Sequence, residues 1–579
     1  MASGASAASA AKMMSLAATE NIRISWYLGY VWAATIAVIF IYQLWLSSVR
    51  YVRTLACLGN DKQQYFAVPD ATYAKIKRYL LDAPLFRKRH NREFRLSTAV
   101  NVGTIPGRLQ TLYLVGYIAT NITFCVISID FSEKADTLSS QVRNRTGVLA
   151  VMNMLPLFVL AGRNNPLIKL LDVSFDTYNL MHRWIGRIVV LEILAHTLAW
   201  TVNKVQTDGW AVVGKSMASS QLILSGTIGT CAVLAILFLS PSPLRHAYYE
   251  VFLHVHILLA VLVIVAVWVH LKSLSQQAIL LGVIAIWAAE RLMRLYSIVR
   301  NNVGHGGTTA EVEALPGDAI RVTLHLARPW KFRPGQHVYL YMPSLGWWTS
   351  HPFSLAWSDE ERDLVSEKTS PLDQLESLER RRTTMSLVIR RRTGFTEQLW
   401  TKAESSPKGT FITSALVEGP YGNQSLDSYG HVMLFAAGIG ITHAVPHARD
   451  LVKKFAEDSC ATRRVTLVWI IQSPEHLEWI RPWMTEILGM EKRRDVLKIL
   501  LFVTRPRSTK EIHSPSASVQ MYPGKPDVGA LISQEQARQV GTMAVSVCGT
   551  GSLGDDVRRA VRDRSEVTAI DFVEETFSW

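Results

Sequence analysis

The sequence predicts a multi-domain membrane protein, in which an α-helical transmembrane bundle of about seven spans precedes a cytoplasmic module made of an antiparallel β-barrel and an α/β domain. Its 579 residues are 49% hydrophobic and only 19% charged, which is an apolar composition for so long a chain. The apolar residues are concentrated in the first 300 positions. After residue 300 the pattern changes to short alternating strands, and then to buried strands separated by helices.

Seven apolar segments have about the 20 residues that a helix needs to cross a bilayer. They are 26–46, 109–129, 146–162, 180–201, 220–240, 252–271 and 277–297. Basic residues gather in the run 87–95, between the first two segments, and at the end of the last segment and beyond it at Arg291, Arg294 and Arg300. Lys and Arg mark the cytoplasmic side, so both regions should lie inside and the N-terminus outside.

The net charge of +14 fits this topology, because the basic clusters flank the apolar segments. We therefore expect the lipid bilayer as a partner and no nucleic acid. The five cysteines are scattered without a C-x-x-C pair, which argues against a disulfide scaffold, a zinc ribbon or a c-type haem.

The patterns divide the chain into five regions. They are a disordered Ala/Ser-rich tail (1–25), an extra transmembrane helix with a basic cytoplasmic loop (26–108), a six-helix transmembrane domain (109–300), a β-barrel domain (301–425) and an α/β domain (426–579). Two polar stretches, 358–384 and 506–530, are expected to be surface insertions.

Two of the predicted spans each contain a pair of histidines, His182 and His196 in one and His256 and His270 in the other, and both spacings are 14 residues. This is just under four helical turns, so the two rings of a pair share one helix face about 21 Å apart. One span separates the two helices, so they run parallel, with His182 facing His256 on the inner side and His196 facing His270 on the outer side. The pattern predicts two b-type haems, each bound by one histidine from each helix.

The alternative for these histidines is interhelical hydrogen bonding, and the duplicated spacing argues against it. Two neutral imidazoles leave an iron no open position, so such a haem conducts electrons. Arg183 and Arg187 at the inner end either neutralise haem propionates or anchor the helix. Glu192, one turn before His196, is assigned no more than a structural hydrogen bond.

Three turns after residue 300 have the composition of nucleotide-binding sites. Arg390 and the two arginines after it precede Gly394-Phe395-Thr396 at a helix start, where backbone N–H groups and guanidinium groups suit a pyrophosphate; a solvated strand end is the alternative. Gly438-Ile439-Gly440-Ile441-Thr442 follows a buried strand, although it lacks the third glycine of the Rossmann fingerprint. Cys548-Gly549-Thr550-Gly551 ends another buried strand, where ligands gather in open α/β sheets.

Together with His351-Pro352-Phe353-Ser354, these motifs resemble the ferric reductase and NADPH oxidase superfamily, most closely its fungal ferric reductase branch, from residue 100 to Trp579. The resemblance implies a ferredoxin-reductase-like module with FAD in the barrel and NADPH in the α/β domain. It implies that residues His351 to Leu355 contact the flavin, with Phe353 packed on the ring and Ser354 near N5. It also implies that the Gly394 turn binds the FAD phosphates.

By the same resemblance, Cys548 lies beside the nicotinamide, and the terminal Trp579 covers the flavin until the nicotinamide displaces it. Ser354, Cys548 and Trp579 are therefore the candidate catalytic residues; for Cys548 the alternative is a small buried hydrophobic residue. NADPH rather than NADH is implied by the family and by Arg505, which follows a strand and would meet a 2′-phosphate.

The resemblance implies an NADPH-dependent ferric-chelate reductase with FAD and two haems b. It would reduce Fe³⁺, free or chelated, and also Cu²⁺, on the extracellular or lumenal side. One alternative is a superoxide-generating NADPH oxidase, which uses dioxygen. A second, of another class, is a non-catalytic transporter or receptor with a degenerate reductase tail, which predicts no haem. The plasma membrane is the expected location and an endomembrane the alternative, and neither a metal permease nor a regulatory partner is identified by the motifs.

Overall fold

The computed structural model describes residues 2–89, 105–241, 244–245, 248–304, 306–346, 349–361, 382–422, 424–506, 514 and 516–575. It contains two compact units. Unit 1 is built mainly from Met1–Leu46 and Asn91–Met293, and unit 2 from Ser47–His90 and Arg294–Phe577. Each unit is described by itself.

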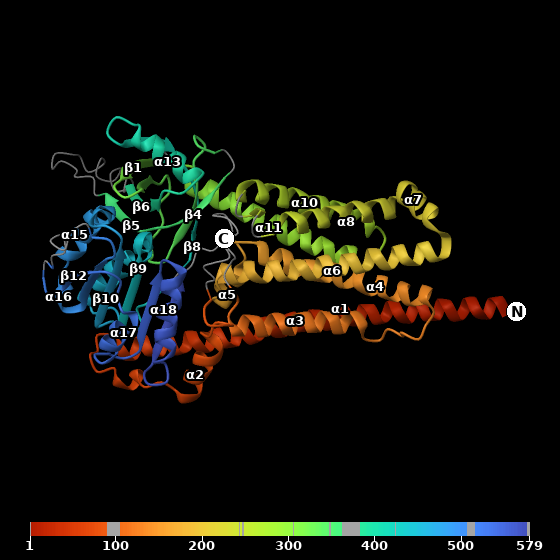
Figure 1. Ribbon diagram of the computed structural model, residues 1–579, viewed down its shortest axis with the longest axis horizontal. Helices are drawn as coiled ribbons and strands as arrows, with labels where there is room; N and C mark the ends of the chain where they lie inside the picture. Colours follow the sequence, from red (N-terminus) through yellow and green to blue (C-terminus); the bar gives the residue numbers. More distant parts are fainter. Residues whose placement is uncertain are drawn as a thin grey trace, which may run out of the picture. The chain divides into compact units, whose positions relative to one another are not determined.

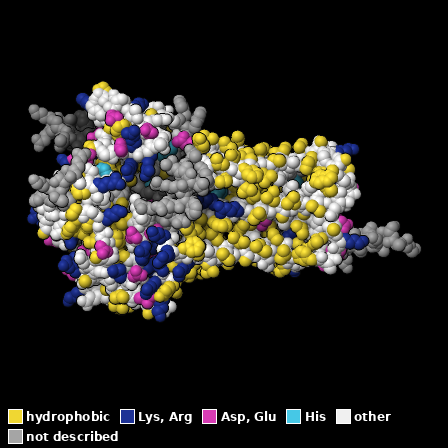
Figure 2. All heavy atoms as spheres, in the orientation of Figure 1, with side chains coloured by type: hydrophobic (Ala, Val, Ile, Leu, Met, Phe, Trp, Pro, Cys, Tyr) yellow, Lys and Arg dark blue, Asp and Glu magenta, His cyan; other side chains and the backbone are white. Residues whose placement is uncertain are grey.

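Unit 1 is an α-helical bundle (Figure 1). Its long helices are α1 (Ala2–Cys57), α3 (Arg108–Val126), α4 (Ala135–Ala161), α6 (Phe175–Asp208), α8 (Gln221–Leu239), α10 (Tyr249–His270) and α11 (Gln277–Asn302), with the short helices α5 (Pro166–Leu171) and α7 (Trp210–Ser219) between them. Six of these, α1, α3, α4, α6, α8 and α10, are long and apolar enough to cross a membrane. Hydrophobic side chains cover the visible face of the bundle (Figure 2), so the chain is a multi-pass membrane protein.

One expectation about this unit is corrected, and another stays a prediction. The predicted seventh span, 277–297, lies in α11, whose apolar part is followed by Glu290, Arg291 and Arg294, so α11 is not among the six candidate spans by length and composition. The segment 1–25, expected to be a disordered tail, is helical from Ala2 onward. The helical conformation follows from the alanine-rich composition of this segment, since alanine has the highest helix propensity of all residues.

Within unit 2, residues 309–421 form a barrel-like pair of antiparallel sheets, as predicted. One sheet has the order β5-β6-β2-β1-β7 and the other β4-β3-β8. The strands are β1 (Thr309–Leu315), β2 (Ala319–His325), β3 (His337–Tyr341), β4 (His351–Ser354), β5 (Trp357–Glu361), β6 (Arg382–Arg390), β7 (Thr410–Ser414) and β8 (Leu416–Tyr421), with α13 (Phe395–Glu404) before β7. Alternating residues of β1 and β2 are buried, which gives this domain its apolar core.

The C-terminal end of α11 is fixed to strand β8 of this barrel. The side-chain amide of Asn302 donates to the Val417 carbonyl at 2.9 Å, and its oxygen accepts from the Val417 N–H at 2.9 Å. Ser297 and Asn301 donate to the Gly419 carbonyl at 3.2 and 2.8 Å. Asn302 therefore pairs with β8 much as a neighbouring strand would.

The second half of unit 2 is the predicted parallel α/β domain, with strand order β12-β11-β10-β9-β13-β14. Its strands are β9 (His431–Ala437), β10 (Arg464–Ile471), β11 (Leu497–Val503), β12 (Val519–Pro523), β13 (Met543–Cys548) and β14 (Ile570–Glu575). Its helices are α14 (Ile441–Ala456), α15 (Arg481–Gly489), α16 (Arg493–Val496), α17 (Val528–Gln536) and α18 (Gly551–Arg562), with the 3₁₀ turns η3 (Gly438–Gly440) and η4 (Pro474–Trp479). The chain runs outward from β9 to β12 and then returns to place β13 on the other side of β9.

The two expected insertions are only partly described. Residues 358–361 and 382–384 belong to β5 and β6, while 362–381 lie outside the described residues. In the second stretch, β12 pairs in parallel with β11, so the expectation of an insertion without an element is wrong there. Five residues at a sheet edge are too few to produce a clear periodic pattern.

Residues 47–90, which we call the inter-span segment, fold onto the α/β domain within unit 2. This segment contains the end of α1, the 3₁₀ turn η1 (Gln64–Ala67), α2 (Ala71–Ile76) and the π-turn η2 (Lys77–Leu81). Lys77 Nζ donates to the Ile570 carbonyl at 2.6 Å, and Gln63 Nε2 donates to the Ala461 carbonyl at 2.6 Å. The segment and the two domains thus belong to one unit, as the topology that the basic residues predict would require.

Candidate haem and nucleotide sites

The structure brings the four membrane histidines together in two pairs, His182 with His256 and His196 with His270. The ring centroids are 6.3 Å apart in the first pair and 6.0 Å apart in the second, and the rings are inclined by 69° and 86°. In each pair one ring comes from α6 and the other from α10. The rings therefore pair as the 14-residue spacing predicts.

Backbone carbonyls orient three of these imidazoles. The Nδ1 atom of His182 is 2.9 Å from the Leu157 carbonyl, that of His196 is 2.8 Å from the Arg143 carbonyl, and that of His270 is 2.8 Å from the Leu222 carbonyl. A hydrogen bond from Nδ1–H to a carbonyl fixes the tautomer and leaves Nε2 as a free electron-pair donor, which is the usual arrangement of a metal-bound histidine.

The spacing of the rings fits a shared iron. An imidazole nitrogen binds a metal at about 2 Å and the ring centroid lies roughly 1 Å behind it, so two imidazoles on opposite sides of one iron have centroids about 6 Å apart. Both observed separations have this value. The described residues contain no group of three or more His, Cys, Asp or Glu side chains that could hold a metal ion by themselves.

The fourth ring, His256, has a buried Nδ1 atom that makes no hydrogen bond to the described residues. His254, two residues earlier, is turned away from the pairs: its Nδ1 is 2.7 Å from the Glu250 carbonyl of the same helix. The two residues are about 200° apart around the helix, which explains why they face different directions.

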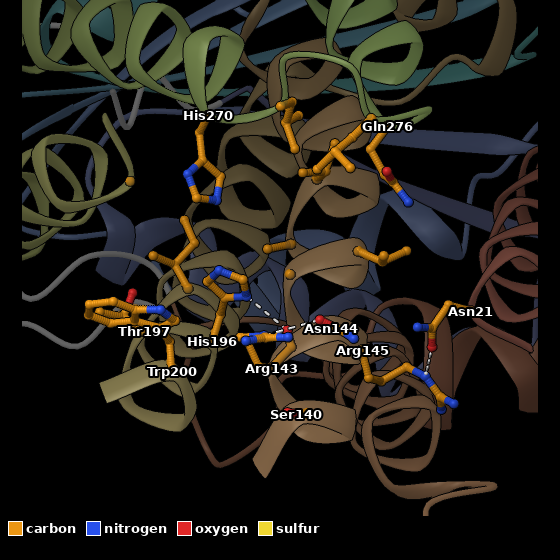
Figure 3. A pocket seen from close by; sticks show the side chains of 18 of the residues that line it. Asn21, Ser140, Arg143, Asn144, Arg145, His196, Thr197, Trp200, His270 and Gln276 are labelled. Carbon is orange, nitrogen blue, oxygen red and sulfur yellow. Dashed lines mark hydrogen bonds between the residues drawn. The ribbon is translucent and has the colours of Figure 1, made fainter. Parts of the chain in front are cut away.

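The outer pair faces a cavity of about 1000 Å³ within unit 1, which is large enough for a cofactor. His196 and His270 point toward one another across it in Figure 3, and the dashed line there joins His196 to the Arg143 backbone. Arg145, also at this cavity, donates from its guanidinium to Asn21 Oδ1 at 2.6 Å and to the Phe124 and Ile127 carbonyls at 2.8 and 2.7 Å.

Two glycines permit the rings of the outer pair to approach the neighbouring helices. A Cβ atom on Gly147 of α4 would lie 2.6 Å from His196 Nδ1, and one on Gly226 of α8 would lie 2.8 Å from His270 Nδ1. No side chain fits in either space without moving the ring. Neither glycine stands out in the sequence, since glycine is common in transmembrane helices.

Glu192 has the structural hydrogen bonds that the sequence analysis assigns to it. Its two carboxylate oxygens accept from Asn153 Nδ2 at 2.9 and 3.0 Å, and Asn153 also donates to Asn121 Oδ1 at 2.7 Å. Tyr117 donates to Asn153 Oδ1, and Trp32 Nε1 of α1 donates to Tyr117 at 3.3 Å. This buried polar chain links the extra helix α1 to the six-helix core.

The predicted flavin segments lie together in the barrel. His351 of β4 stacks on Phe395, the first residue of α13, with centroids 4.6 Å apart, and Phe353 lies 6.5 Å from the same ring. Gly394 has φ +82°, a conformation that favours glycine. Thr396 accepts from the Arg392 N–H at 2.9 Å and holds this turn closed. The structure thus joins the His351-Pro352-Phe353-Ser354 strand to the Gly394 turn.

Not every predicted flavin residue is at the surface of this site. Leu355 is 1% exposed and belongs to the apolar core of the barrel. His337, which the sequence analysis did not select, pairs directly across the sheet from Ser354, and its ring stacks on Tyr421 with centroids 5.7 Å apart. An imidazole within an otherwise apolar and aromatic strand was the available signal for it.

The two glycine-rich turns of the α/β domain meet at the carboxyl ends of β9 and β13. These strands are neighbours, and the strand order reverses between them, which is where open α/β sheets bind ligands. A Cβ on Gly440 would lie 2.1 Å from the Cys548 carbonyl oxygen, and one on Gly549 would lie 2.7 Å from Ala437 Cβ. Both glycines are needed for the two turns to approach each other this closely.

The remaining residues of the predicted nucleotide site differ in exposure. Arg505 follows β11 at the same edge of the sheet and is exposed, while Ile441 is buried in the core and Thr442 Oγ1 donates to the Ile439 carbonyl at 2.9 Å. Thr550 precedes α18. Trp579 lies outside the described residues, so its predicted position over the flavin stays a prediction.

Two buried histidines of α14 lie behind the Gly438–Thr442 turn. The rings of His443 and His447 are 4.9 Å apart, and burial lowers the pKa of His443 to about 4 and that of His447 well below its usual value. Both are therefore neutral at physiological pH. A phosphate at this turn would be stabilised by the N-terminus of α14 and not by these imidazoles.

Cys548 is a buried, protonated thiol. Burial raises its pKa to about 12, and the carboxylates of Glu575 and Glu574 add to the effect. At pH 8 only about one thiol in 10⁴ is then ionised. We expect Cys548 to resist iodoacetamide in the folded protein and to react fully after denaturation, as measured by mass spectrometry of its peptide. Rapid alkylation in the folded state would contradict this prediction.

Comparison with known proteins agrees with this architecture. Three family models match: "Ferric reductase like transmembrane component" at residues 146–267, "FAD-binding domain" at 305–370 and "Ferric reductase NAD binding domain" at 429–562. The first runs from α4 into α10 and contains His182, His196 and His256, the second covers β1 to β5, and the third covers the parallel sheet from β9 to α18.

Curated relatives match over most of the chain. The "Ferric/cupric reductase transmembrane component 2" of Saccharomyces cerevisiae is 26% identical over 570 residues, which are 91% of this chain and 75% of that protein. The "Ferric/cupric reductase transmembrane component 1" of Candida albicans is 26% identical over 87% of this chain and 67% of its own. The "Probable cell surface ferric reductase kap2" of Aspergillus oryzae is 30% identical over 58% of this chain and 44% of its own. With the membrane helices, the paired histidines and the two nucleotide-binding folds in one chain, the protein is similar to ferric reductases over most of its length.

Proposed function

We propose that this protein transfers electrons from cytoplasmic NADPH across the membrane to ferric iron, free or chelated, and also to cupric ion. The relatives whose names refer to ferric or cupric reductases support this substrate class. The enzyme would be an NADPH-dependent ferric-chelate reductase with FAD and two haems b.

The observation that carries the proposal is the pairing of four imidazoles at the separation that one iron requires, 6.3 and 6.0 Å between ring centroids. His182 and His256 would hold the inner haem, and His196 and His270 the outer haem. Bound in this way, haem supplies one-electron chemistry with no open coordination position. The carbonyls of Leu157, Arg143 and Leu222 keep the rings in the tautomer that binds iron.

In unit 2, residues on the β4 strand and the Gly394 turn would hold FAD, with Phe353 supplying an aromatic face and Ser354 a hydroxyl near the ring. FAD supplies the conversion of a two-electron donor into single electrons. The turns at Gly438 and Cys548 would hold NADPH at the reversal point of the parallel sheet, with Arg505 as the residue for its 2′-phosphate. Trp579 is proposed to cover the flavin in the absence of nicotinamide.

We place the reaction at the plasma membrane, with the acceptor outside the cell, because one fungal relative is named as a cell surface ferric reductase. The inter-span segment and unit 2 would then be cytoplasmic, since basic residues flank the spans on that side. A permease that takes up the reduced metal is a fitting partner.

Acceptor identity is tested with superoxide dismutase. The purified protein is mixed with NADPH and a ferric chelate, and formation of the ferrous product is followed. We expect its rate to be unchanged when the dismutase is added or when oxygen is removed. The reason is that electrons pass directly to the metal. Loss of the signal under either condition would instead identify dioxygen as the acceptor. A purified protein without paired b-type absorption bands would overturn the proposal as a whole.

A further inference from the structure

Arg89, at the end of the inter-span segment, belongs to a basic run whose composition is typical of a cytoplasmic loop between membrane spans. Its two neighbours Arg87 and Lys88 are exposed, as expected for residues that only mark the cytoplasmic side. Arg89 differs from them. Its backbone N–H donates to Asp555 Oδ1 at 3.0 Å, and its Nη1 lies 3.5 Å from Glu574 Oε2.

Both partners of Arg89 lie on the elements that flank the Cys548–Gly551 turn. Asp555 is on α18, the helix that begins at this turn, and is 5% exposed. Glu574 is on β14, next to β13, where its pairing partner is Val547, the residue before Cys548. The arginine therefore connects the helix after the turn to the strand beside it.

Glu574 is a buried carboxylate between two guanidinium groups. Its side chain is 8% exposed, and it pairs with Arg558 of α18 as well as with Arg89. Arg558 in turn stacks over Phe572 at 4.4 Å and donates to the Asp82 carbonyl of the inter-span segment at 3.4 Å. Removing one partner of a buried ion pair leaves a poorly compensated charge, which is more damaging than losing a surface pair.

We propose that Arg89 is a positioning residue of the nicotinamide nucleotide site. It fixes β14 against α18 and offsets the negative charge of Glu574 beside the turn where an anionic dinucleotide binds. Through Arg89, the inter-span segment thus helps to position the elements that form the nucleotide site. The inference rests on the proposed function, because it takes NADPH as the ligand of the Cys548–Gly551 turn.

The test uses the full-length, flavin-loaded protein and titration with NADP⁺, followed by the change in flavin absorbance. R89Q keeps the backbone bond to Asp555 and removes the charge, and we expect its Kd for NADP⁺ to rise about five- to tenfold, since a partly buried ion pair contributes about 1 kcal/mol. R87Q, the matched control in the same run, should bind like the wild type. R89K should be intermediate, because lysine keeps the charge without the planar fork of arginine.

A double-mutant cycle separates this role from a general loss of structure. In an E574Q background, R89Q should have little further effect on the Kd, because the charge that Arg89 offsets is gone. The KM for NADPH should rise in R89Q while the KM for the ferric chelate and the dithionite-reduced haem spectrum stay unchanged. An unchanged Kd in R89Q, or an equal rise with and without Glu574, overturns the inference.

Two outcomes keep the inference distinct from the proposed function. If the wild type gives no response to NADP⁺ and its flavin is not reduced by NADPH, the proposed function fails. If the wild type responds and R89Q binds equally well, only the role of Arg89 fails. Should R89Q be obtained without flavin, R89K decides, since a Kd above that of R87Q supports the inference and an equal Kd overturns it.

Discussion

His270→Ala is expected to reduce transmembrane ferric reduction by about 100-fold or more, while a dye that takes electrons from the flavin is still reduced at the wild-type rate. The imidazole of His270 lies 6.0 Å from that of His196, and without it an iron at this position has one protein ligand in place of two. The measurement pairs NADPH-driven reduction of an external ferric chelate with the dithionite-reduced spectrum, which should lose about half of its b-type absorbance.

His254→Ala is the matched control for this substitution. His254 is on the same helix, but its ring is bonded to the Glu250 carbonyl of its own turn and faces neither pair. We expect both absorbance and reduction to be normal in this variant. If His270→Ala and His254→Ala have the same absorbance and the same rate of ferric reduction, the histidine pairs do not hold the haems that carry electrons across the membrane.

Gly226→Ala should remove the outer haem although it adds only one methyl group. The added Cβ would lie 2.8 Å from His270 Nδ1 and 2.9 Å from its Cε1, so the ring has to turn and its 2.8 Å bond to the Leu222 carbonyl is lost. We expect at least about a tenfold loss of ferric reduction, because metal ligands without their supporting hydrogen bond bind about 10- to 100-fold more weakly. Haem stoichiometry of the purified variant measures the effect.

Gly229→Ala, three residues further along α8, controls for the change from glycine to alanine. A Cβ there meets its nearest neighbour, Ala266 Cβ, at 3.6 Å, which is ordinary van der Waals contact. Both substitutions favour the helix by up to about 1 kcal/mol, so helix propensity cannot explain a difference between them. If the Gly226→Ala protein still contains two haems, or if both variants lose a haem, the position of the His270 ring does not depend on the absence of a side chain at Gly226.

The features that the sequence predicts well are those set by periodicity. The spacing of His182, His196, His256 and His270 determines which rings meet, because two parallel helices allow only that pairing. Buried strands and the glycine turns after them likewise predict the parallel sheet and its ligand-binding edge. In these cases local pattern and fold agree.

Features that depend on contacts between distant segments were not predictable in this way. Nothing near Arg143 or Leu222 indicates that their carbonyls orient histidines, because every residue has a carbonyl. The sequence does not indicate that the inter-span segment docks on the α/β domain through Lys77 and Arg89, because membrane topology already accounts for basic residues there. Helix α11 shows another difficulty: its apolar start predicts a span, while the charged residues of its second half keep it out of the six candidate spans.

The pairing of Asn302 with Val417 restricts how the connection between the last bundle helix and the barrel can vary. A single residue inserted between Ser297 and Asn301 would rotate Asn302 about 100° around the helix axis relative to Ser297, so the two side chains could no longer both face β8. Seven inserted residues, close to two whole turns, would return it to nearly the same face but about 10 Å further along. The spacing of these residues along the helix is therefore as restricted as their identity, and a flexible segment in their place could not hold them on one face.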